Sequence, residues 1–180
     1  MSHRNKVLLV DENDEILGVE DKLSAHQGHG KRHRAFSVFI TNADGHLLMQ
    51  KRASAKYHAG GLWSNSCCSH PQPGEDIVSS AESRLQEELG FTTSVQKFSK
   101  IEYREYVGNN LTEWELDHLF WGESSARKVI PNPDEVDDID WVDIDELQRE
   151  ISLRPDAYTS WLPLILPEFC DFIKKNKSAG

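Results

Sequence analysis

Cysteine is scarce in this sequence, which has three among its 180 residues, Cys67, Cys68 and Cys170. So few thiols cannot form the disulfide framework of a small secreted domain, and an odd number is typical of a reducing compartment. Two of the three are neighbours, and a bridge between adjacent residues is disfavoured because their Cα atoms lie too close for relaxed geometry. The vicinal pair raises the question of which thiol, if either, does chemistry.

Long apolar runs and basic stripes are absent as well. The run nearest the start, VLLV at 7–10, spans four residues, which is too short for a signal peptide or a membrane span. The net charge is −10, so nucleic acid is not an expected partner. The sequence therefore predicts a cytoplasmic protein with no membrane partner. An anionic ligand would need local cations or metal ions to overcome the repulsion from the net charge.

The remaining composition is that of a globular protein, with 38% hydrophobic and 28% charged residues. We predict a single domain over residues 1–180. The clearest element is a helix over Ile77–Leu89, where apolar residues recur every four positions and Gly90 follows as a stop.

The other predicted elements are mostly strands joined by tight turns. They are strands at 7–10, 15–20, 97–107 and 111–121, a hairpin at 35–50 turning at Asp44-Gly45, a strand running into a helix at 139–151, an ordered loop with short extended pieces at 57–74, and a helix at 157–177 broken by Pro163 and Pro167. Helices mixed with antiparallel hairpins indicate an α+β fold, an α/β/α sandwich with a mixed sheet.

Histidines and carboxylates form the first candidate site. His26 and His33 lie seven residues apart, and His70 follows the cysteine pair; the other five, His3, His29, His46, His58 and His118, are interpreted as surface or packing residues. In an extended strand Glu113 and Glu115 point to the same face. One interpretation of that face is a solvated acidic surface, which Asp117 would extend. The other is a metal site, since imidazoles and carboxylates together suit Zn²⁺, Mn²⁺ or Mg²⁺.

The same alternation separates the two neighbouring cysteines. If NSCCSHP at 65–71 is extended, Cys68 shares a face with His70 and Cys67 points away. Should His70 bind a metal, Cys68 is then the cysteine at the site, and nearby positive charge would make it reactive. Cys67 is interpreted as a small buried apolar residue.

The stretch from Ser69 to Phe91 resembles a Nudix box with departures. Glu75, Glu87 and Glu88 match glutamates of the motif, while Ser69 replaces its first glycine. The Arg-Glu pair of the motif becomes Ser83-Arg84. A cation thus stands where a Nudix hydrolase has a metal-binding glutamate, and the hydrolase metal cluster cannot be built in the usual way.

Four motifs together resemble the type I isopentenyl-diphosphate isomerases, a Nudix-like branch that does not hydrolyse. They are the histidine pair His26 and His33, NSxCxHP at 65–71, QEELG at 86–90, and Glu113 with Glu115. The similarity spans about Lys22 to Trp161. It implies a Nudix-like sandwich, and a metal-dependent enzyme of isoprenoid biosynthesis that interconverts isopentenyl and dimethylallyl diphosphate.

The resemblance also implies roles for individual residues. A divalent ion, Mn²⁺, Zn²⁺ or Mg²⁺, would be held by His26, His33, His70, Glu113 and Glu115. A second Mg²⁺, arriving with the diphosphate, would use Glu88 and the main-chain carbonyl of Cys68. The diphosphate would be held by Lys22, Arg52, Lys56 and Arg84. The catalytic residues would be Cys68, Glu115, Tyr103 and Trp161.

This chemistry needs an acid, a base and exclusion of water, because protonating an alkene creates a carbocation-like transition state. A tryptophan face stabilises such charge, which suits Trp161. Glu115, assisted by Tyr103, would deliver a proton and Cys68 would remove one; the reversed assignment satisfies the chemistry equally. The expected partners are small allylic and homoallylic diphosphates, for a monomer or homodimer.

Two other functions compete with the isomerase. A nucleotide diphosphohydrolase would need the intact Arg-Glu pair, which Ser83-Arg84 replaces. A binding module without catalysis would be expected to lack the cysteine or the metal ligands, all of which are present. An assay of product and metal content separates the three.

Overall fold

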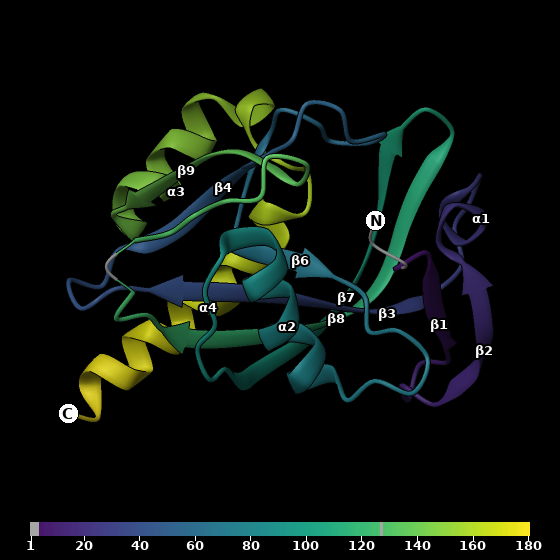
Figure 1. Cartoon of the computed structure of the whole chain (residues 1–180), viewed down its shortest axis with the longest axis horizontal. Helices are drawn as coiled ribbons and strands as arrows, with labels where there is room; N and C mark the ends of the chain where they lie inside the picture. Colours follow the sequence, from purple (N-terminus) through teal and green to yellow (C-terminus); the bar gives the residue numbers. More distant parts are fainter. Residues whose placement is uncertain (1–3, 127) are drawn as a thin grey trace.

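The computed structural model describes residues 4–126 and 128–180, so His3 lies outside the described residues. Its strands form one nine-stranded sheet (Figure 1). The strands are β1 (Lys6–Val10), β2 (Ile16–Asp21), β3 (His33–Thr41), β4 (Leu47–Arg52), β5 (Trp63–Ser64), β6 (Cys67–Ser69), β7 (Gln96–Gly108), β8 (Leu111–Glu123) and β9 (Val136–Val142). The helices are α1 (Lys22–His26), α2 (Ile77–Leu89), α3 (Ile144–Leu153) and α4 (Leu162–Ser178), with a short 3-10 turn at Pro155–Ala157.

The central strand β3 makes the sheet mixed. It runs parallel to β8, from the pair His33 and Glu115 to the pair Thr41 and Glu123, and antiparallel to β1, β4 and β6. Strand β7 pairs antiparallel with the other edge of β8. Strand β8 is therefore an interior strand with backbone partners on both edges.

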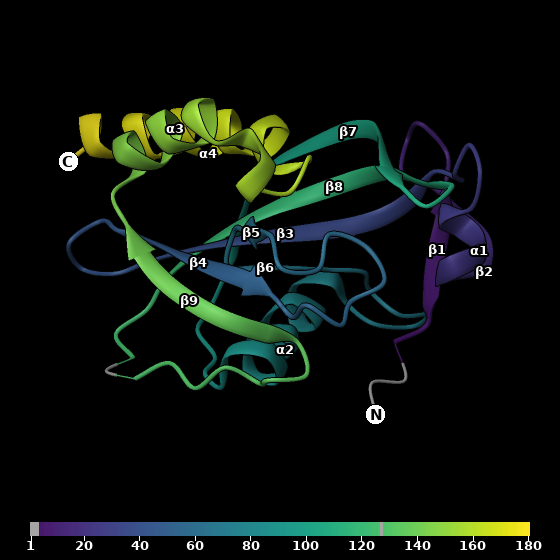
Figure 2. The ribbon, with the colours of Figure 1, turned by 90° about the horizontal axis from the view of Figure 1, so that it is seen from above.

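Helices cover both faces of the sheet, which confirms the predicted α/β/α sandwich. Figure 2 shows α3 and α4 on one side of the strands and α2 on the other. Under α4, Phe39 stacks on Phe169 with ring centroids 4.4 Å apart, in a cluster that also holds Tyr103 and Trp161. Under α2, a second cluster holds Phe36, Phe120, Leu85 and Cys67. The sheet is therefore packed on both faces, with one apolar cluster on each.

The helix predicted over Ile77–Leu89 is confirmed at both ends. The Asp76 side chain accepts a hydrogen bond from the backbone N–H of Ser79, which caps the first turn. Gly90 ends the helix in the left-handed conformation, with φ 73°, which glycine adopts without a Cβ clash. The predicted hairpins are confirmed, as is the loop at 57–74, which contains β5 and β6.

The prediction that prolines break the C-terminal helix is wrong. Helix α4 is continuous from Leu162 to Ser178 with Pro167 inside it. Pro163 lies in the first turn, where a missing N–H breaks no helical bond. Apolar residues recur at helical spacing on its inner face, and Leu166, Phe169 and Cys170 there are buried. Their packing outweighs the hydrogen bond that Pro167 removes.

Helix α1 was not predicted, because the segment is polar and interrupted by glycines. Asp21 caps it by accepting from the backbone N–H groups of Leu23 and Ser24, and the helix buries Ala25 and His26. Within the described ranges, no helix has both the length and the apolar character needed to cross a membrane.

Candidate active site

A cavity of about 190 Å³ opens beside the β3, β8 and β7 strands. Small-ligand sites are concave pockets with a few convergent polar groups, and drug-sized ligands occupy larger ones. Its lining residues come from almost every part of the chain: Arg4, Lys22, Phe36, Arg52, Lys56, His58, Cys68, Ser69, His70, Arg84, Glu88, Tyr103, Glu113, Glu115, Glu135 and Trp161. Nearly all the residues predicted for catalysis, metal and substrate binding are on this wall. The exceptions are His26 and His33, which lie beneath it.

Sheet register explains how three of these residues meet. Glu115 on β8 lies opposite His33 on β3 and opposite Tyr103 on β7. Residues that face each other across strands share a side of the sheet. The Tyr103 hydroxyl donates a 2.6 Å hydrogen bond to Glu115 Oε2. Glu115 is therefore held in place from the neighbouring strand.

Three imidazoles gather around the other oxygen of Glu115. The distances from Glu115 Oε1 to the Nε2 atoms are 3.0 Å for His70, 3.5 Å for His33 and 4.0 Å for His26. One ligand atom from each of these four buried residues can be chosen so that all lie within 4.8 Å of one another. The interpretation of this strand face as a solvated acidic surface is wrong, since Glu113, Glu115 and Asp117 are all buried.

The tautomers of two histidines suit a metal ion. His26 Nδ1 lies 2.6 Å from the carbonyl of Lys22, and His33 Nδ1 lies 2.7 Å from the carbonyl of Lys31. A carbonyl can only accept, so each Nδ1 carries the hydrogen and each Nε2 presents a lone pair. Both Nε2 atoms are buried without a hydrogen-bond partner. Such outer hydrogen bonds are what orient ligating imidazoles, so the residues present fit a divalent ion.

Electrostatics separate the two glutamates. Burial works to raise the pKa of Glu115, but the imidazoles of His33 and His70 beside the carboxylate outweigh it and hold that pKa well below its usual range. Burial, followed by the charge of Glu115, raises the pKa of Glu113 to about 7. Burial also lowers the pKa of His70 to about 3, so its ring is neutral, as a metal ligand requires.

Glu113 and His58 form a separate buried pair next to this cluster. His58 Nε2 lies 2.8 Å from Glu113 Oε1. Burial lowers the pKa of His58 to about 3, so a neutral ring donates to the carboxyl group. His58 was interpreted from the sequence as a surface or packing residue, whereas it lines the cavity. A lone histidine in a glycine-rich loop gives no periodic signal from which that place could be found.

The two cysteines face opposite sides of the sheet, as the alternation predicted. Cys68 lies opposite Ser37 in the pairing of β6 with β3, and it lines the cavity. Burial raises the pKa of Cys68 to about 12. Cys67 is fully buried and packs in the cluster under α2. Cys68 is therefore the thiol that can reach a ligand.

Trp161 closes the cavity from the start of α4. Its indole Nε1 donates a 3.2 Å hydrogen bond to Ser64 Oγ. The Arg52 guanidinium lies 5.2 Å from the centre of its ring, which places a cation over the aromatic face. Tyr103 and Trp161 are both buried in the cluster under α4, so the apolar part of the site continues into the protein core.

Two cations at the cavity have no carboxylate partner within the described part of the chain. Neither Lys22 nor Arg52 makes an ion pair there, and the Nε of Arg52 is buried without a hydrogen-bond partner. Burial, followed by the charges of Lys56 and Arg52, lowers the pKa of Lys22 to about 8. Crowded cations without matching acids favour an anionic ligand.

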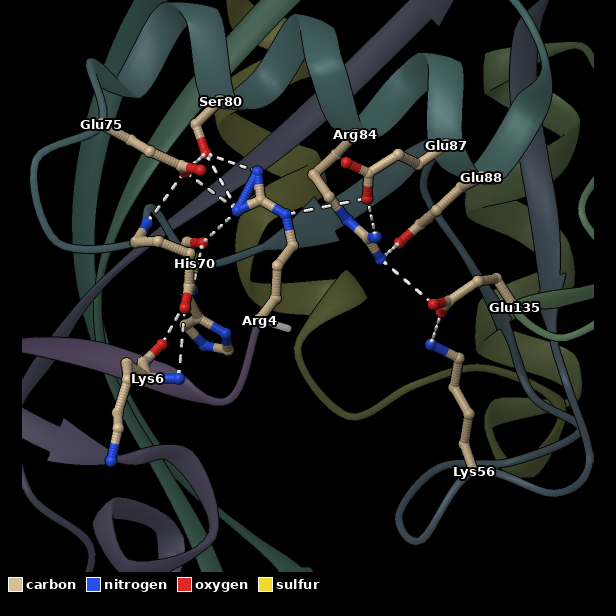
Figure 3. Close-up of polar contacts among 11 residues, drawn as sticks. Arg4, Lys6, Lys56, His70, Glu75, Ser80, Arg84, Glu87, Glu88 and Glu135 are labelled. Atoms are coloured by element: carbon tan, nitrogen blue, oxygen red, sulfur yellow. Dashed lines mark hydrogen bonds and ion pairs between the residues drawn. The ribbon is translucent and has the colours of Figure 1, made fainter. Parts of the chain in front are cut away.

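The other two predicted cations are already paired. Figure 3 shows Arg84 pointing from α2 toward Glu87 and Glu88 of the same helix and toward Glu135, which also binds Lys56. Glu88 also accepts a 2.9 Å hydrogen bond from Gln50. Both carboxylate oxygens of Glu88 thus have protein partners.

Arg4 is a cavity residue that no sequence motif predicted. It precedes β1, and Figure 3 shows its guanidinium between the start of α2 and the His70 segment. Its Nη1 lies 2.9 Å from Glu75 Oε2 and 3.4 Å from the carbonyl of His70. Ser80 Oγ lies 3.2 Å from its Nη2. Arg4 therefore joins three segments around the cavity.

Three further histidines stay outside this cavity and are surface or packing residues, as predicted. His118 is buried with its Nε2 2.8 Å from Asp14 Oδ2. His29 is exposed and His46 is half-buried in the turn between β3 and β4.

Comparisons with known proteins agree with this geometry. The family model described as NUDIX domain matches residues 31–162. The chain is 47% identical over 158 residues to "Isopentenyl-diphosphate Delta-isomerase 1" of Aromatoleum aromaticum, covering 88% of each chain. It is 42% identical over 173 residues to "Isopentenyl-diphosphate Delta-isomerase" of Pectobacterium atrosepticum, covering 96% of each.

Solved structures share the fold. A crystal structure of a Deinococcus radiodurans protein superposes with a TM-score of 0.74 at 20% identity, covering 90% of this chain and 97% of that one. A MutT protein from Methanosarcina mazei gives 0.64 at 16% identity, covering 81% and 96%. The chain belongs to the NUDIX family and, within it, to the isopentenyl-diphosphate Delta-isomerases.

Proposed function

We propose that this protein interconverts isopentenyl diphosphate and dimethylallyl diphosphate. One observation carries the proposal: Glu115, hydrogen-bonded to Tyr103, lines the same cavity as the Cys68 thiol. Both are in a chain whose relatives are named for this isomerisation. Moving a double bond requires one proton to be added to the terminal alkene carbon and another removed from the carbon on the other side of the resulting cationic centre. Two acid–base groups at one cavity meet that requirement.

Glu115 and Cys68 exchange protons with the carbon skeleton. The raised pKa of Cys68 favours a protonated thiol and the lowered pKa of Glu115 favours an ionised carboxylate, which accepts from the Tyr103 hydroxyl. From this state Cys68 delivers a proton to the terminal alkene carbon, and Glu115 takes one from the carbon on the other side of the cationic centre. The reversed assignment uses the same two groups, and reversibility requires each to serve in both roles. Trp161, buried beside them, stabilises the positive charge that develops on carbon and excludes water.

The diphosphate occupies the cationic side of the cavity. Lys22 and Arg52 have no acidic partner in the described residues and so are free to bind phosphate oxygens. Lys56 and Arg84 contact the ligand from the opposite side, where they also bind Glu135. Charge-assisted hydrogen bonds of this kind offset the repulsion from a chain of net charge −10.

Two metal ions complete the proposal. His26, His33, His70 and Glu115, with Glu113 beside them, would hold a divalent ion, Mn²⁺, Zn²⁺ or Mg²⁺. When bound, it would fix the orientation of these groups and polarise the Glu115 carboxylate. A second ion, Mg²⁺ brought by the diphosphate, would use Glu88 and the carbonyl of Cys68.

The single domain over 1–180, the cytoplasmic location and the monomeric or homodimeric state stay predictions from the sequence.

Incubation in heavy water tests the reaction itself. With Mg²⁺ and isopentenyl diphosphate, we expect dimethylallyl diphosphate that carries deuterium on carbon, with the diphosphate intact, because the acid–base groups exchange their protons with solvent. Mass spectrometry of the product and a phosphate assay read both results. Release of phosphate without deuterium in the carbon skeleton would show that the hydrolase alternative is right.

Arg4→Gln tests the cationic side of the cavity. We expect the KM for isopentenyl diphosphate to rise about fivefold with a smaller change in kcat, because one positive charge beside the ligand is lost. Steady-state kinetics measure both constants. The matched control is Arg154→Gln, which removes an exposed arginine paired with Glu150 on α3. An unchanged KM in Arg4→Gln would mean that Arg4 does not contribute to binding.

A further inference from the structure

Asp117 is a buried carboxyl group that the proposed reaction does not use. It lies on β8 two residues beyond Glu115, on the same face of the strand, and it is fully buried behind the cavity wall. Its Oδ2 accepts a 2.7 Å hydrogen bond from Ser37 Oγ, and its Oδ1 has no partner. Burying a carboxyl group with so few partners is unfavourable. A stability role therefore does not explain why a carboxyl group occupies this position.

Ser37 connects this carboxyl group to the thiol. Ser37 on β3 lies directly opposite Cys68 on β6, and its Oγ is 3.5 Å from Cys68 Sγ. Neither Ser37 nor Asp117 lines the cavity. Both residues lie behind the thiol, and Ser37 is the one that contacts it.

A second group holds the thiol from the other direction. Cys68 Sγ lies 3.0 Å from Asn65 Oδ1. The Asn65 amide nitrogen donates to the carbonyls of Val38 and Cys67, at 3.0 and 3.2 Å, so its oxygen must face the thiol. The sulfur is therefore bracketed by Asn65 and by Ser37, and each bracketing group is itself hydrogen-bonded to a neighbour.

Hydrogen bonds also connect Asn65 to Trp161 at the opposite wall of the cavity. Ser64 Oγ donates a 3.0 Å hydrogen bond to Asn65 Oδ1 and accepts one from Trp161 Nε1. A continuous chain of side chains thus runs from the indole to the thiol and on to Asp117. Buried hydrogen bonds of this kind fix the geometry of the groups that make them.

We propose that Asp117 and Ser37 are positioning residues that hold the Cys68 thiol toward the cavity. The inference rests on the proposed function, in which Cys68 exchanges a proton with the substrate. A cysteine side chain has three staggered rotamers, of which only some direct the sulfur at a bound ligand. With Asp117 anchoring Ser37, the sulfur has a fixed contact on each side. Proton transfer to carbon depends strongly on such alignment.

Four variants test the proposal. We expect Ser37→Ala and Asp117→Leu each to lower kcat about tenfold with KM within about twofold of wild type, because the misplaced thiol affects chemistry and not binding. Asp117→Asn should stay within about threefold, since its amide oxygen can still accept from Ser37. The control is Thr41→Val on the same strand, which removes another buried hydroxyl, the acceptor for Trp121 Nε1, outside the cavity. It should leave kcat unchanged.

Thermal unfolding separates positioning from folding. A purely structural role predicts a lower Tm and a lower fraction of active protein with unchanged kcat per folded molecule. We expect the Tm of Asp117→Leu to be equal to or above wild type, because a buried polar group is replaced by an apolar one. If Asp117→Leu does not fold, the kcat values of Ser37→Ala and Asp117→Asn still distinguish a positioning role from a structural one.

Wild-type kcat in folded Ser37→Ala would overturn the inference while leaving the isomerase proposal intact. A loss in Asp117→Asn as large as in Asp117→Leu would overturn the role of Asp117 as an acceptor for Ser37. If wild-type protein put no deuterium on carbon, the proposed function itself would fail, and that result is read without any variant.

Discussion

Cys68→Ala is expected to lower kcat for isomerisation by about a thousandfold or more, while Cys67→Ala keeps most of the activity. General acid–base groups contribute on the order of 10² to 10⁴ in rate, and no other described side chain at this wall of the cavity presents a thiol. Steady-state assays with isopentenyl diphosphate, together with thermal unfolding of both variants, measure the contrast.

The expected contrast follows from the side of the sheet that each thiol faces. Cys68 lines the cavity, whereas Cys67 is fully buried under α2 among apolar side chains. Replacing Cys67 with alanine leaves a small void, which costs about 1 kcal/mol of stability. In a chain of this size the Tm then falls by roughly 2–4 °C. Cys67→Ala therefore reports on packing and Cys68→Ala on chemistry.

Two results would contradict this assignment. Equal loss of activity in both variants, with both folded, would mean that neither the alternation in β6 nor the cavity distinguishes the thiols. Full activity in Cys68→Ala would remove the thiol from the mechanism and leave Glu115 and Tyr103 as the remaining acid–base pair. Cys170→Ala is the matched control, since Cys170 is buried in the cluster under α4 and does not line the cavity.

Local periodicity predicted the elements that depend on neighbouring residues. The helix Ile77–Leu89 was predicted from an apolar residue at every fourth position and a glycine after the last one. The opposite orientation of Cys67 and Cys68 needed only alternation along an extended strand. Both patterns act over a few residues, so they can be seen in one sequence.

Alternation along a strand could not predict burial that depends on residues far away in the sequence. Glu113, Glu115 and Asp117 have the pattern of an exposed acidic strand, yet all three are buried, under segments distant in sequence that include those of His58 and His70. Strand order is set by long-range pairing, which a single strand does not encode. Arg4 and His58 reach the cavity for the same reason, through contacts with residues more than fifty positions away.

The continuous helix α4 shows how tertiary packing overrides a local rule. Proline inside a helix removes a hydrogen bond and crowds the preceding turn, and the sequence therefore predicted a break. Pro167 is nevertheless within α4, whose neighbours Leu166 and Phe169 are buried. The burial of that apolar face, which sequence alone cannot place against β3 and β7, decides the outcome.

Removal of the divalent ion is expected to reduce both activity and stability. His26 Nε2 and His33 Nε2 are buried lone pairs without a hydrogen-bond partner, and Glu115 lies within reach of both. An ion at 100 times its Kd stabilises the folded state by about 2.7 kcal/mol. We therefore expect excess chelator to lower the Tm by roughly 5–10 °C.

His33→Ala should have the same effect as chelator, and chelator should then add nothing further. We expect it to lower kcat at least about a hundredfold, since loss of even an outer partner of a metal ligand costs 10- to 100-fold. His46→Ala is the control, because that half-buried histidine lies outside the cavity. Elemental analysis of the purified protein, the Tm with and without chelator, and kcat are measured together. Full activity and an unchanged Tm in chelator would refute the metal site, because the two buried lone pairs would then need no ion to be stable.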